Sequence, residues 1–406
     1  MFNERWISLV IMMILIGLVI QQAGLLILAA LLGTIIPLAW LWNRYSLRRV
    51  EYTRSFSEKR AFIGELVDLT LQVTNRKILP LTWLKIEDEF PHGITLLNEA
   101  TISPTLGMDL LVNLLSLRWY ERVRWRYRLQ CDSRGYYAFG PARLFSGDLF
   151  GLFAQEGRLP SRDALIVYPQ VRPLEEFGLP PKEPFGEVKA RQRIFEDPSR
   201  TIGVRDYGPG DEFKKIHWKA TARRQQLQVK VYEPTTTSQL VIMVNIATLP
   251  KFWQGVIPER LERTISLVAS LAHYAIEKRY QVGVLANGCW PFSHHPLKVL
   301  PSRDPDQLTR ILEALAVVSS MPTLALEDLL TRESPHLPWG ATLVVVTSVV
   351  TDEILAAMMS LRDAGRRQVL ISLDEKAPQD DLPGILVHRL PFKDFVSAQK
   401  QEKVQA

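Results

Sequence analysis

The sequence predicts an α/β domain with a doubly wound sheet, preceded by an antiparallel β-sandwich and an N-terminal transmembrane helical hairpin. Three observations lead to this prediction. Residues 6–42 carry no charged side chain. Residues 50–155 alternate apolar and polar side chains, which is the period of half-buried strands. Residues 234–392 alternate apolar strands with amphipathic helices, as in a sheet covered by helices. A chain of 406 residues is long enough for two soluble domains and an anchor.

The anchor is predicted at residues 1–49, where Arg5 and Arg44 bracket the uncharged run. A single helix of that length would measure about 55 Å, far more than the ~30 Å hydrocarbon core of a bilayer. The polar pair Gln21-Gln22 divides the run, so we expect two spans at 6–20 and 23–42. The run continues past the usual apolar core of a signal peptide and has no clean cleavage site, which argues against removal.

The charges that follow the anchor predict its orientation. Arg44, Arg48, Arg49 and Arg54 lie just beyond the second span, and cationic flanks favour the cytoplasmic side. The two cysteines, Cys131 and Cys289, fall in different predicted domains and give no disulfide framework, as expected in a reducing compartment. We therefore expect a plasma-membrane protein with cytoplasmic domains.

The β-sandwich is predicted at residues 50–155. Alternation is clear at 66–73 and 122–129, and turn-forming residues separate the short strands. The second strand carries a row of arginines at 122, 124, 126 and 128. We interpret the row as a solvated sheet face; the alternative is a cationic stripe facing lipid headgroups or nucleic acid. Residues 156–203 are rich in proline and are predicted to connect the domains.

The segment 204–233 combines a turn, a basic run and a strand. Asp206 to Asp211 forms a loop by composition, and Asp211 is placed to cap a following helix. Phe213, Ile216 and Ala220 recur at helical spacing, and we expect Trp218 to be buried. Residues 189–230 hold eleven Lys/Arg and five Asp/Glu, an excess equal to the net charge of the whole chain, +6. A local basic patch therefore carries the charge imbalance of the chain.

Two other functions of this segment were weighed. The glycine-containing loop lacks the spacing of a phosphate-binding loop, so we expect no nucleotide. The basic run has few interleaved aromatic side chains and matches no nucleic-acid-binding motif, so nucleic-acid binding is the weaker alternative.

The α/β domain is predicted at residues 234–392, and a polar tail follows at 393–406. The predicted strands are 240–246, 280–286, 343–347 and 368–373. The predicted helices are 258–278, 306–318, 325–331 and 352–364.

The central segment resembles the signature of the bacterial "domain of unknown function 58" family. The resemblance is carried by Arg205, Tyr207, Gly210-Asp211, Ile216, Trp218, Ala222-Arg223, Leu227 and Val229. A membrane hairpin, a β domain ending in Gly147-Asp148-Leu149-Phe150-Gly151-Leu152-Phe153 and then this signature are similar to that family's layout. The resemblance implies a von Willebrand factor A-like C-terminal domain and a partnership with a MoxR-type AAA+ ATPase, and it implies no established reaction.

A von Willebrand A domain binds a divalent cation through an Asp-x-Ser-x-Ser phrase after its first strand. The matching residues here are Asn245, Ala247 and Leu249, and the later phrase is Thr347-Ser348 without an Asp. Hard cations need charged oxygen ligands, so we expect no metal and no other cofactor.

One enzymatic pattern remains as an alternative. Gly288-Cys289-Trp290, with His294 and His295 nearby, resembles the cysteine phrase of transglutaminase-like enzymes. A nucleophilic cysteine needs a base within hydrogen-bonding reach and surroundings that lower its pKa. Cys289 follows a strand and precedes Pro291, so we interpret it as a loop cysteine.

The sequence therefore predicts a membrane-anchored, non-enzymatic scaffold or adaptor that works with a MoxR-type AAA+ ATPase in protein assembly or maturation. The predicted docking residues are Arg205, Tyr207, Gly210, Asp211, Lys214, Lys215, Trp218, Arg223 and Lys230.

Overall fold

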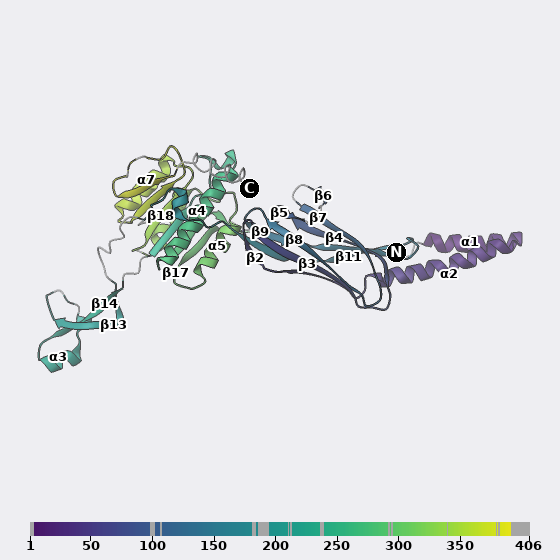
Figure 1. Ribbon diagram of the computed structural model, residues 1–406, viewed down its shortest axis with the longest axis horizontal. Coiled ribbons are helices and arrows are strands. Elements are labelled where there is room, and N and C mark those ends of the chain that lie inside the picture. The colour runs from purple at the N-terminus through teal and green to yellow at the C-terminus, as the bar shows by residue number, and fades with distance from the viewer. Residues whose placement is uncertain are drawn as a thin grey trace. The chain divides into compact units, whose positions relative to one another are not determined.

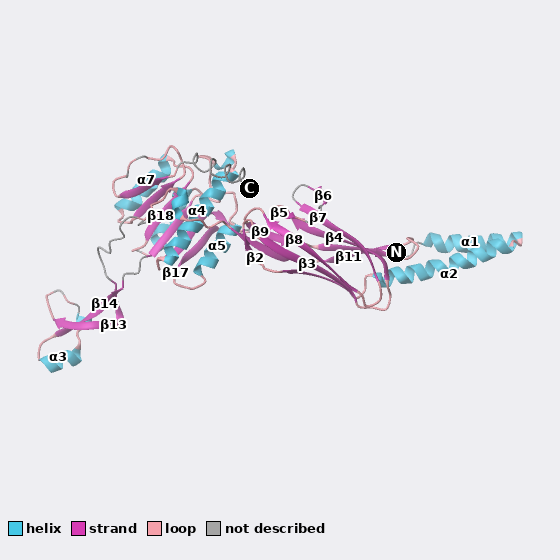
Figure 2. Ribbon diagram, viewed as in Figure 1, coloured by secondary structure: helices cyan, strands magenta, loops and turns pink. Residues whose placement is uncertain are grey.

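The chain forms two compact units, Met1–Pro169 and Gln170–Ala406. Figures 1 and 2 show the secondary structure of the computed structural model. It describes residues 4–97, 102–105, 108–180, 184–185, 195–209, 211, 213–235, 239–290, 293, 295–338, 340–378, 380 and 382–390. Each unit is described by itself.

The first unit begins with two apolar helices, α1 (Glu4–Ile20) and α2 (Ala23–Ser46). They pack closely because glycine faces the neighbouring helix: a Cβ on Gly17 would lie 3.0 Å from Leu26 Cδ2. Among the described residues, α2 is the one helix long and apolar enough to cross a bilayer, with a mean hydropathy of 2.3. The apolar part of α1 is shorter, Ser8–Ile20. One candidate span is therefore present where two were predicted.

The described residues that follow form twelve strands in three sheets. One four-stranded antiparallel sheet has the order β1 (Val50–Phe56), β3 (Leu66–Asn75), β8 (Arg122–Cys131) and β5 (Ile94–Leu96). A five-stranded antiparallel sheet has the order β11 (Ala154–Leu159), β10 (Ala142–Gly147), β4 (Leu81–Pro91), β7 (Met108–Leu117) and β6 (Ile102–Thr105). A small mixed sheet contains β2 (Arg60–Phe62), β12 (Asp163–Tyr168) and β9 (Gly135–Phe139).

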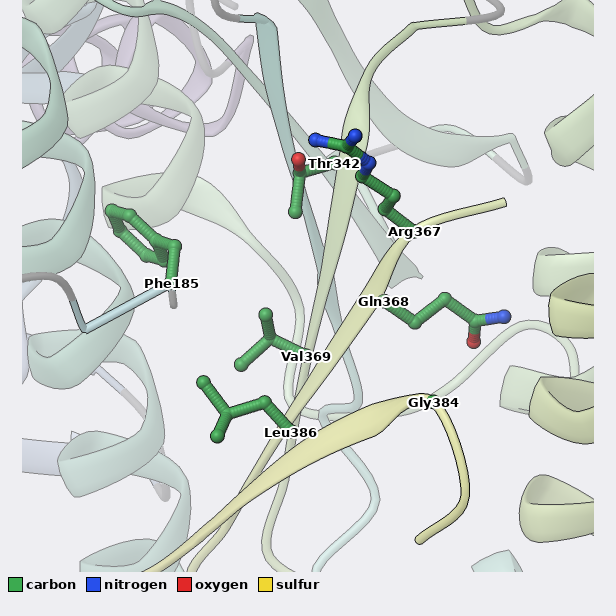
Figure 3. A pocket seen from close by; sticks show the side chains of 7 residues that line it. All are labelled: Phe185, Thr342, Arg367, Gln368, Val369, Gly384 and Leu386. Atoms are coloured by element: carbon green, nitrogen blue, oxygen red, sulfur yellow. The ribbon is translucent and has the colours of Figure 1, made fainter. Parts of the chain in front are cut away.

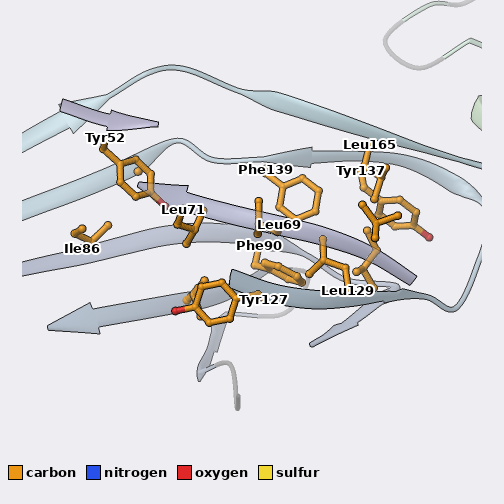
Figure 4. Packing of buried hydrophobic residues seen from close by; sticks show 14 of the residues in the cluster. Tyr52, Leu69, Leu71, Ile86, Phe90, Tyr127, Leu129, Tyr137, Phe139 and Leu165 are labelled. Carbon is orange, nitrogen blue, oxygen red and sulfur yellow. The ribbon is translucent and has the colours of Figure 1, made fainter. Parts of the chain in front are cut away.

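The apolar faces of these strands share one core, shown in Figure 4. The alternation in β3 is seen directly, because Leu69, Leu71 and Val73 are buried while Gln72 is only partly covered. Burying one such side chain contributes about 1.5–3 kcal/mol, so the alternating pattern is enough to hold the sheets face to face. The arginine row of β8 lies on the exposed face, and Arg124 donates to Gln72 Oε1 at 2.7 Å.

Arg54 forms a buried ion pair that joins β1 to β4, which belong to different sheets. Its Nε and Nη2 atoms each donate to the Asp88 carboxylate at 2.7 Å, and Nη1 donates to Asp163 at 3.1 Å. The Tyr52 hydroxyl donates to the same Asp88 carboxylate at 2.6 Å. The Arg54 side chain is only 1% exposed, so it is not one of the solvent-exposed charges that flank the anchor.

The second unit contains a two-stranded arm and a six-stranded sheet. In the arm, β13 (Phe195–Asp206) pairs with β14 (Gln228–Thr235), and α3 (Trp218–Arg224) lies in the connection. The sheet has the order β17 (Pro296–Ser302), β16 (Gln281–Cys289), β15 (Gln239–Val244), β18 (Thr342–Thr347), β19 (Gln368–Ser372) and β20 (Ile385–Arg389). The helices are α4 (Pro258–Glu277), α5 (Gln307–Val317), α6 (Leu326–Glu333) and α7 (Asp352–Asp363). Short 3-10 helices span Leu174–Phe177, Phe213–Lys215, Phe252–Gln254 and Ser334–His336.

The central strands of this sheet are continuous apolar runs. All six residues of β18 are buried, as expected for a strand covered on both faces. Leu329 and Leu330 of α6 and Met358 of α7 pack on one apolar cluster with β15 and β18.

The predicted fold class, a von Willebrand factor A-like doubly wound domain, is wrong. The six-stranded sheet is mixed, because β17 runs antiparallel to β16, and twelve of the twenty strands in the described residues belong to the sandwich-like sheets of the first unit. The sequence pattern concealed β17, since Pro296 and Pro301 are tolerated in a strand only at an edge. Gly283 of β16 permits the pairing: a Cβ there would lie 2.6 Å from Pro301 Cδ.

Candidate functional site

The arm carries the predicted docking residues and has a small core of its own. The register of β13 and β14 pairs Arg205 with Val229 and Val204 with Lys230. Ile216 makes a single bridge to Val229, and both side chains are buried. The connection between the strands is therefore held against β14 rather than left as an open loop.

Three of the predicted residues meet in the turn after β13. The Arg205 guanidinium donates to the two oxygens of the Asp211 carboxylate, at 2.7 and 2.5 Å. The Gly208 amide donates to the same carboxylate at 2.8 Å, and the Tyr207 hydroxyl donates to the Asp211 carbonyl at 3.2 Å. These hydrogen bonds, chiefly the one from Arg205, hold the pKa of the Asp211 carboxyl below its usual value.

Helix α3 begins later than predicted, and a different residue caps it. Residues 213–215 form a 3-10 turn, Ile216 pairs with β14, and α3 starts at Trp218. The cap is His217, whose Nδ1 accepts from the Ala220 amide at 3.1 Å. Asp211, predicted to cap the helix, instead closes the turn with Arg205, because that ion pair places its carboxylate on the β13 side.

Gln228 ties the connection to the strands, and sequence reasoning missed it. The residue is fully buried, its backbone amide donates to Thr221 Oγ1 at 3.0 Å, and its side-chain amide donates to Asp206 at 2.5 Å. No sequence pattern marks a buried glutamine at the start of a strand, so the signal was absent.

Phe213 and Trp218 project from the arm into solvent, with 68% and 63% of their surfaces exposed. Trp218 is thus not the buried side chain that the sequence predicted, and Phe213 is not on an inward helical face. The Phe213 ring packs edge to face with the Tyr207 ring, at a centroid distance of 6.2 Å. The arm's own core does not use these two aromatic side chains, so their apolar surface is available for a partner.

Cationic side chains lie close to the two aromatic residues in the sequence of the arm. Exposed members are Lys214 of the 3-10 turn and Lys219, Arg223 and Arg224 of α3. Of the remaining predicted residues, Lys215 is partly covered in the 3-10 turn, and Lys230 lies on β14. Gly210 lies outside the described residues. We call Phe213, Lys214, Trp218, Lys219, Arg223 and Arg224 the arm surface.

The carboxyl edge of the six-stranded sheet is where open α/β sheets hold ligands. Asn245 lies there, directly after β15, and hydrogen bonds occupy its amide. Its Nδ2 donates to Thr347 Oγ1 at 3.0 Å, and its Oδ1 accepts from Asn287 Nδ2 at 2.9 Å. The described residues contain no cluster of three or more His, Cys, Asp or Glu side chains arranged to hold a metal. The prediction that no metal binds stays a prediction.

A hollow of about 530 Å³ opens beside this edge, lined among others by Arg260, Asp352 and Asp374. The carboxylate of Asp374 already accepts from the backbone amides of Val350 and Lys376, both at 3.0 Å. A smaller hollow of about 180 Å³ lies at the opposite, amino edge, where Phe185 faces the beginning of β18 and β19 (Figure 3). The larger hollow is also lined by hydroxyl, carboxylate and ammonium groups, from Thr248, Thr351, Glu353, Glu375 and Lys376. The described residues that line the smaller hollow include no carboxylate.

Cys289, the alternative catalytic residue, ends β16. Its thiol lies 3.4 Å from the hydroxyl of Ser319, which itself donates to the Met321 carbonyl at 2.9 Å. His294, one of the two candidate bases, lies outside the described residues. The other cysteine, Cys131, is fully buried in the sandwich, and burial raises its pKa to about 11.

Comparison with known proteins gives two kinds of similarity. The chain is 25% identical over 362 residues to an uncharacterized protein, YeaD, of Bacillus subtilis (strain 168), covering 87% of this chain and 83% of that protein. A cohesin module from a Clostridium perfringens family 33 glycoside hydrolase matches 29% of this chain and 96% of the module, at 14% identity and a TM-score of 0.21. The sporulation control protein Spo0M of Bacillus subtilis matches 32% of this chain and 53% of its own, at 14% identity and a TM-score of 0.20.

Likeness at these TM-scores says nothing about function. The family resemblance of residues 205–229 is tested more directly by a comparison with family models. The matching model includes the arm surface and the six-stranded sheet. Residues 203–390 match the family model described as "Protein of unknown function DUF58".

Proposed function

We propose that the chain is a membrane-anchored, non-enzymatic adaptor whose arm surface docks a partner protein, a MoxR-type AAA+ ATPase. The observation that carries the proposal is the exposure of Phe213 and Trp218 among cationic side chains. Exposed aromatic side chains next to arginine are the residues that most often dominate binding energy at protein interfaces. The surrounding positive charge favours a partner with an acidic docking face and accelerates association.

The Arg205–Asp211 ion pair supports a preorganised docking surface. It closes the turn that leads into the Phe213 side chain, so that the aromatic ring is presented with little freedom to lose on binding. Preorganisation of this kind strengthens binding because fewer side chains have to be ordered at the interface.

Anchoring in the membrane is the second part of the proposal. Helix α2 has the length and hydropathy of a span, and α1 packs against it. We propose that α1 forms a second, short span, which returns the chain to its starting side. Arg44 in the last turn of α2, together with Arg48 and Arg49 just beyond it, favours a cytoplasmic position for both units.

The docking proposal is tested with the full-length protein in detergent and a purified MoxR-type ATPase. We expect Trp218→Ala to weaken binding by about tenfold or more, the effect typical of an interface hot spot. Arg223→Glu should slow association with the ATPase, because it reverses one charge at the rim of the interface. Binding is measured by biolayer interferometry at two salt concentrations.

Trp253→Ala is the matched control, since this tryptophan is 67% exposed but lies outside the arm. Equal affinity of Trp218→Ala and the unmodified chain would contradict the proposal. Tight, strongly salt-dependent binding of duplex DNA, abolished by Arg223→Glu, would favour the nucleic-acid alternative instead.

A further inference from the structure

Three turns meet at the end of the β-sandwich that adjoins α2. The β3–β4 turn (76–80) and the β7–β8 turn (118–121) are joined by Asn75, whose Nδ2 donates to the carbonyls of Leu79 and Arg118 at 3.0 and 2.9 Å. The Arg76 amide donates to the Arg49 carbonyl at 2.9 Å. Arg49 is only three residues beyond the end of α2, a reach of at most about 10 Å.

The β10–β11 turn (148–153) lies at the same end. Ser146 pairs with Leu84 near the beginning of β4, and its hydroxyl donates to the Trp83 carbonyl at 2.8 Å. Within this turn the buried Asp148 carboxylate accepts from the backbone amides of Phe150, Leu152 and Phe153. The turn is therefore held in one shape by its own aspartate.

The three turns project large apolar side chains into solvent, each between 39% and 75% exposed. They are Ile78, Trp119, Tyr120, Leu149, Phe150 and Leu152. We call these six residues the sandwich tip. Tryptophan and tyrosine are favoured where hydrocarbon meets headgroups, because an apolar ring and a polar edge are satisfied at once.

Positive charge accompanies the sandwich tip. Arg44, Arg48, Arg49, Arg76 and Arg118 are exposed around it. The nearby acids are engaged: Glu51 pairs with Arg76 at 2.8 Å, and Glu121 accepts from the Arg118 amide at 2.6 Å. Cationic side chains near a membrane surface are attracted to the anionic headgroups of the cytoplasmic leaflet.

The backbone of Tyr120 adds an independent observation. Its φ angle is +54°, in the left-handed region that favours glycine and disfavours bulky side chains. Strain of this kind is retained where a side chain is needed for something other than stability. The ring of Tyr120 is exposed, so the buried core does not require an aromatic side chain at this position.

We propose that the sandwich tip is a second membrane contact, which seats the β-sandwich in the headgroup region of an anionic bilayer. The inference rests on the proposal that α2 spans that bilayer, and it is independent of the arm surface. The bilayer is the occupant because the tip is hydrogen-bonded to the chain just where α2 ends. Two contacts, a helix and a rigid tip, would fix the tilt of the sandwich, whereas a helix alone would leave it free.

The test uses the full chain with Cys289→Ser, reconstituted in vesicles of phosphatidylglycerol and phosphatidylethanolamine. Single cysteines at Trp119 and Leu149 carry an environment-sensitive NBD dye, and lipids with a doxyl group near the carbonyl end quench it. We expect at least about twofold quenching at both tip positions, as for an interfacial side chain. Leu66→Cys is the control, because it is exposed at the other end of β3, roughly 30 Å away.

A cysteine at Ile27 of α2 separates this inference from the anchor proposal. If Ile27 is quenched and the tip labels behave like Leu66, the inference is wrong and the anchor stands. If Ile27 is not quenched, both fail. A blue-shifted tip label that lipid does not quench means that a second copy of the chain covers the tip, which also overturns the inference. Tyr120→Gly should leave the fold intact and reduce quenching at Trp119.

Discussion

At the scale of single residues, the side chains predicted to dock a partner separate into two roles. Arg205, Tyr207 and Asp211 hold the turn, while Trp218 and Arg223 face solvent. The proposed docking role needs both groups, because the turn positions the segment that carries the exposed aromatic side chains. Substitutions in the first group should therefore change the shape of the arm, and substitutions in the second group should change binding alone.

The Asp211 carboxyl gives a pH prediction. Its pKa in the folded arm lies below the unfolded value, so its contribution to stability is complete above the unfolded pKa and is lost as pH falls through the lowered folded pKa. We expect the arm to be unchanged between pH 7 and pH 5 and to loosen only in stronger acid. The measurement is the carboxyl ¹³C chemical shift of Asp211 against pH. The titration midpoint should rise in Arg205→Gln; an unchanged midpoint would show that the ion pair does not form.

At the scale of secondary-structure elements, the sandwich depends on a buried ion pair as well as on its apolar core. Arg54 and Asp88 face each other across the two sheets, and Gly140 approaches the guanidinium so closely that a Cβ would lie 2.3 Å from Nη2. Desolvated charges of this kind are stable only while both partners remain. Position 140 therefore requires glycine for two reasons: Arg54 leaves no room for a Cβ, and the φ angle is +86°.

Gly140→Ala is expected to displace Arg54 from Asp88 and to lower the free energy of unfolding by about 3–5 kcal/mol, the usual consequence of breaking a buried pair. Gly151→Ala is the matched control. It has a φ of +71° but no atom within 4 Å of the added Cβ, so only the backbone strain of about 1–2 kcal/mol remains. Urea unfolding of both variants measures the difference, and equal losses would argue against the steric explanation.

At the scale of the whole molecule, anchoring and docking are assigned to different parts of the chain. Helix α2 and the sandwich tip belong to the first unit, and the arm surface belongs to the second. The excess positive charge of residues 189–230 lies in the second unit, and a separate set of arginines surrounds the end of α2. A protein built in this way can be fixed at the bilayer while a partner binds elsewhere.

Orientation in the membrane is tested with a membrane-impermeant maleimide on single cysteines, in the Cys289→Ser background. Cysteines at Leu66 and Leu300, which are exposed in the two units, should react in inside-out vesicles and not in intact cells. A cysteine at Gln21, between α1 and α2, should react only from outside if both helices span. If the cysteine at Gln21 does not react from outside, α1 is not a second span.

Local patterns in the sequence determined the apolar helices, the alternating strands of the sandwich and the position of the arm. Each of these follows from the period of apolar side chains over a few neighbouring residues. Residues 205–229, on which the resemblance was recognised in the sequence, lie within the segment 203–390 that matches the family model.

Tertiary structure alone decided the rest. The antiparallel edge strand β17 made the second sheet mixed, because strand direction depends on which partners meet and not on local preference. Trp218 proved exposed because Ile216, two residues before it, pairs with Val229 and takes the one buried position among the described residues of the connection. The sandwich tip draws on turns some seventy residues apart, which only the pairing of β3, β4, β7, β8 and β10 brings to one end.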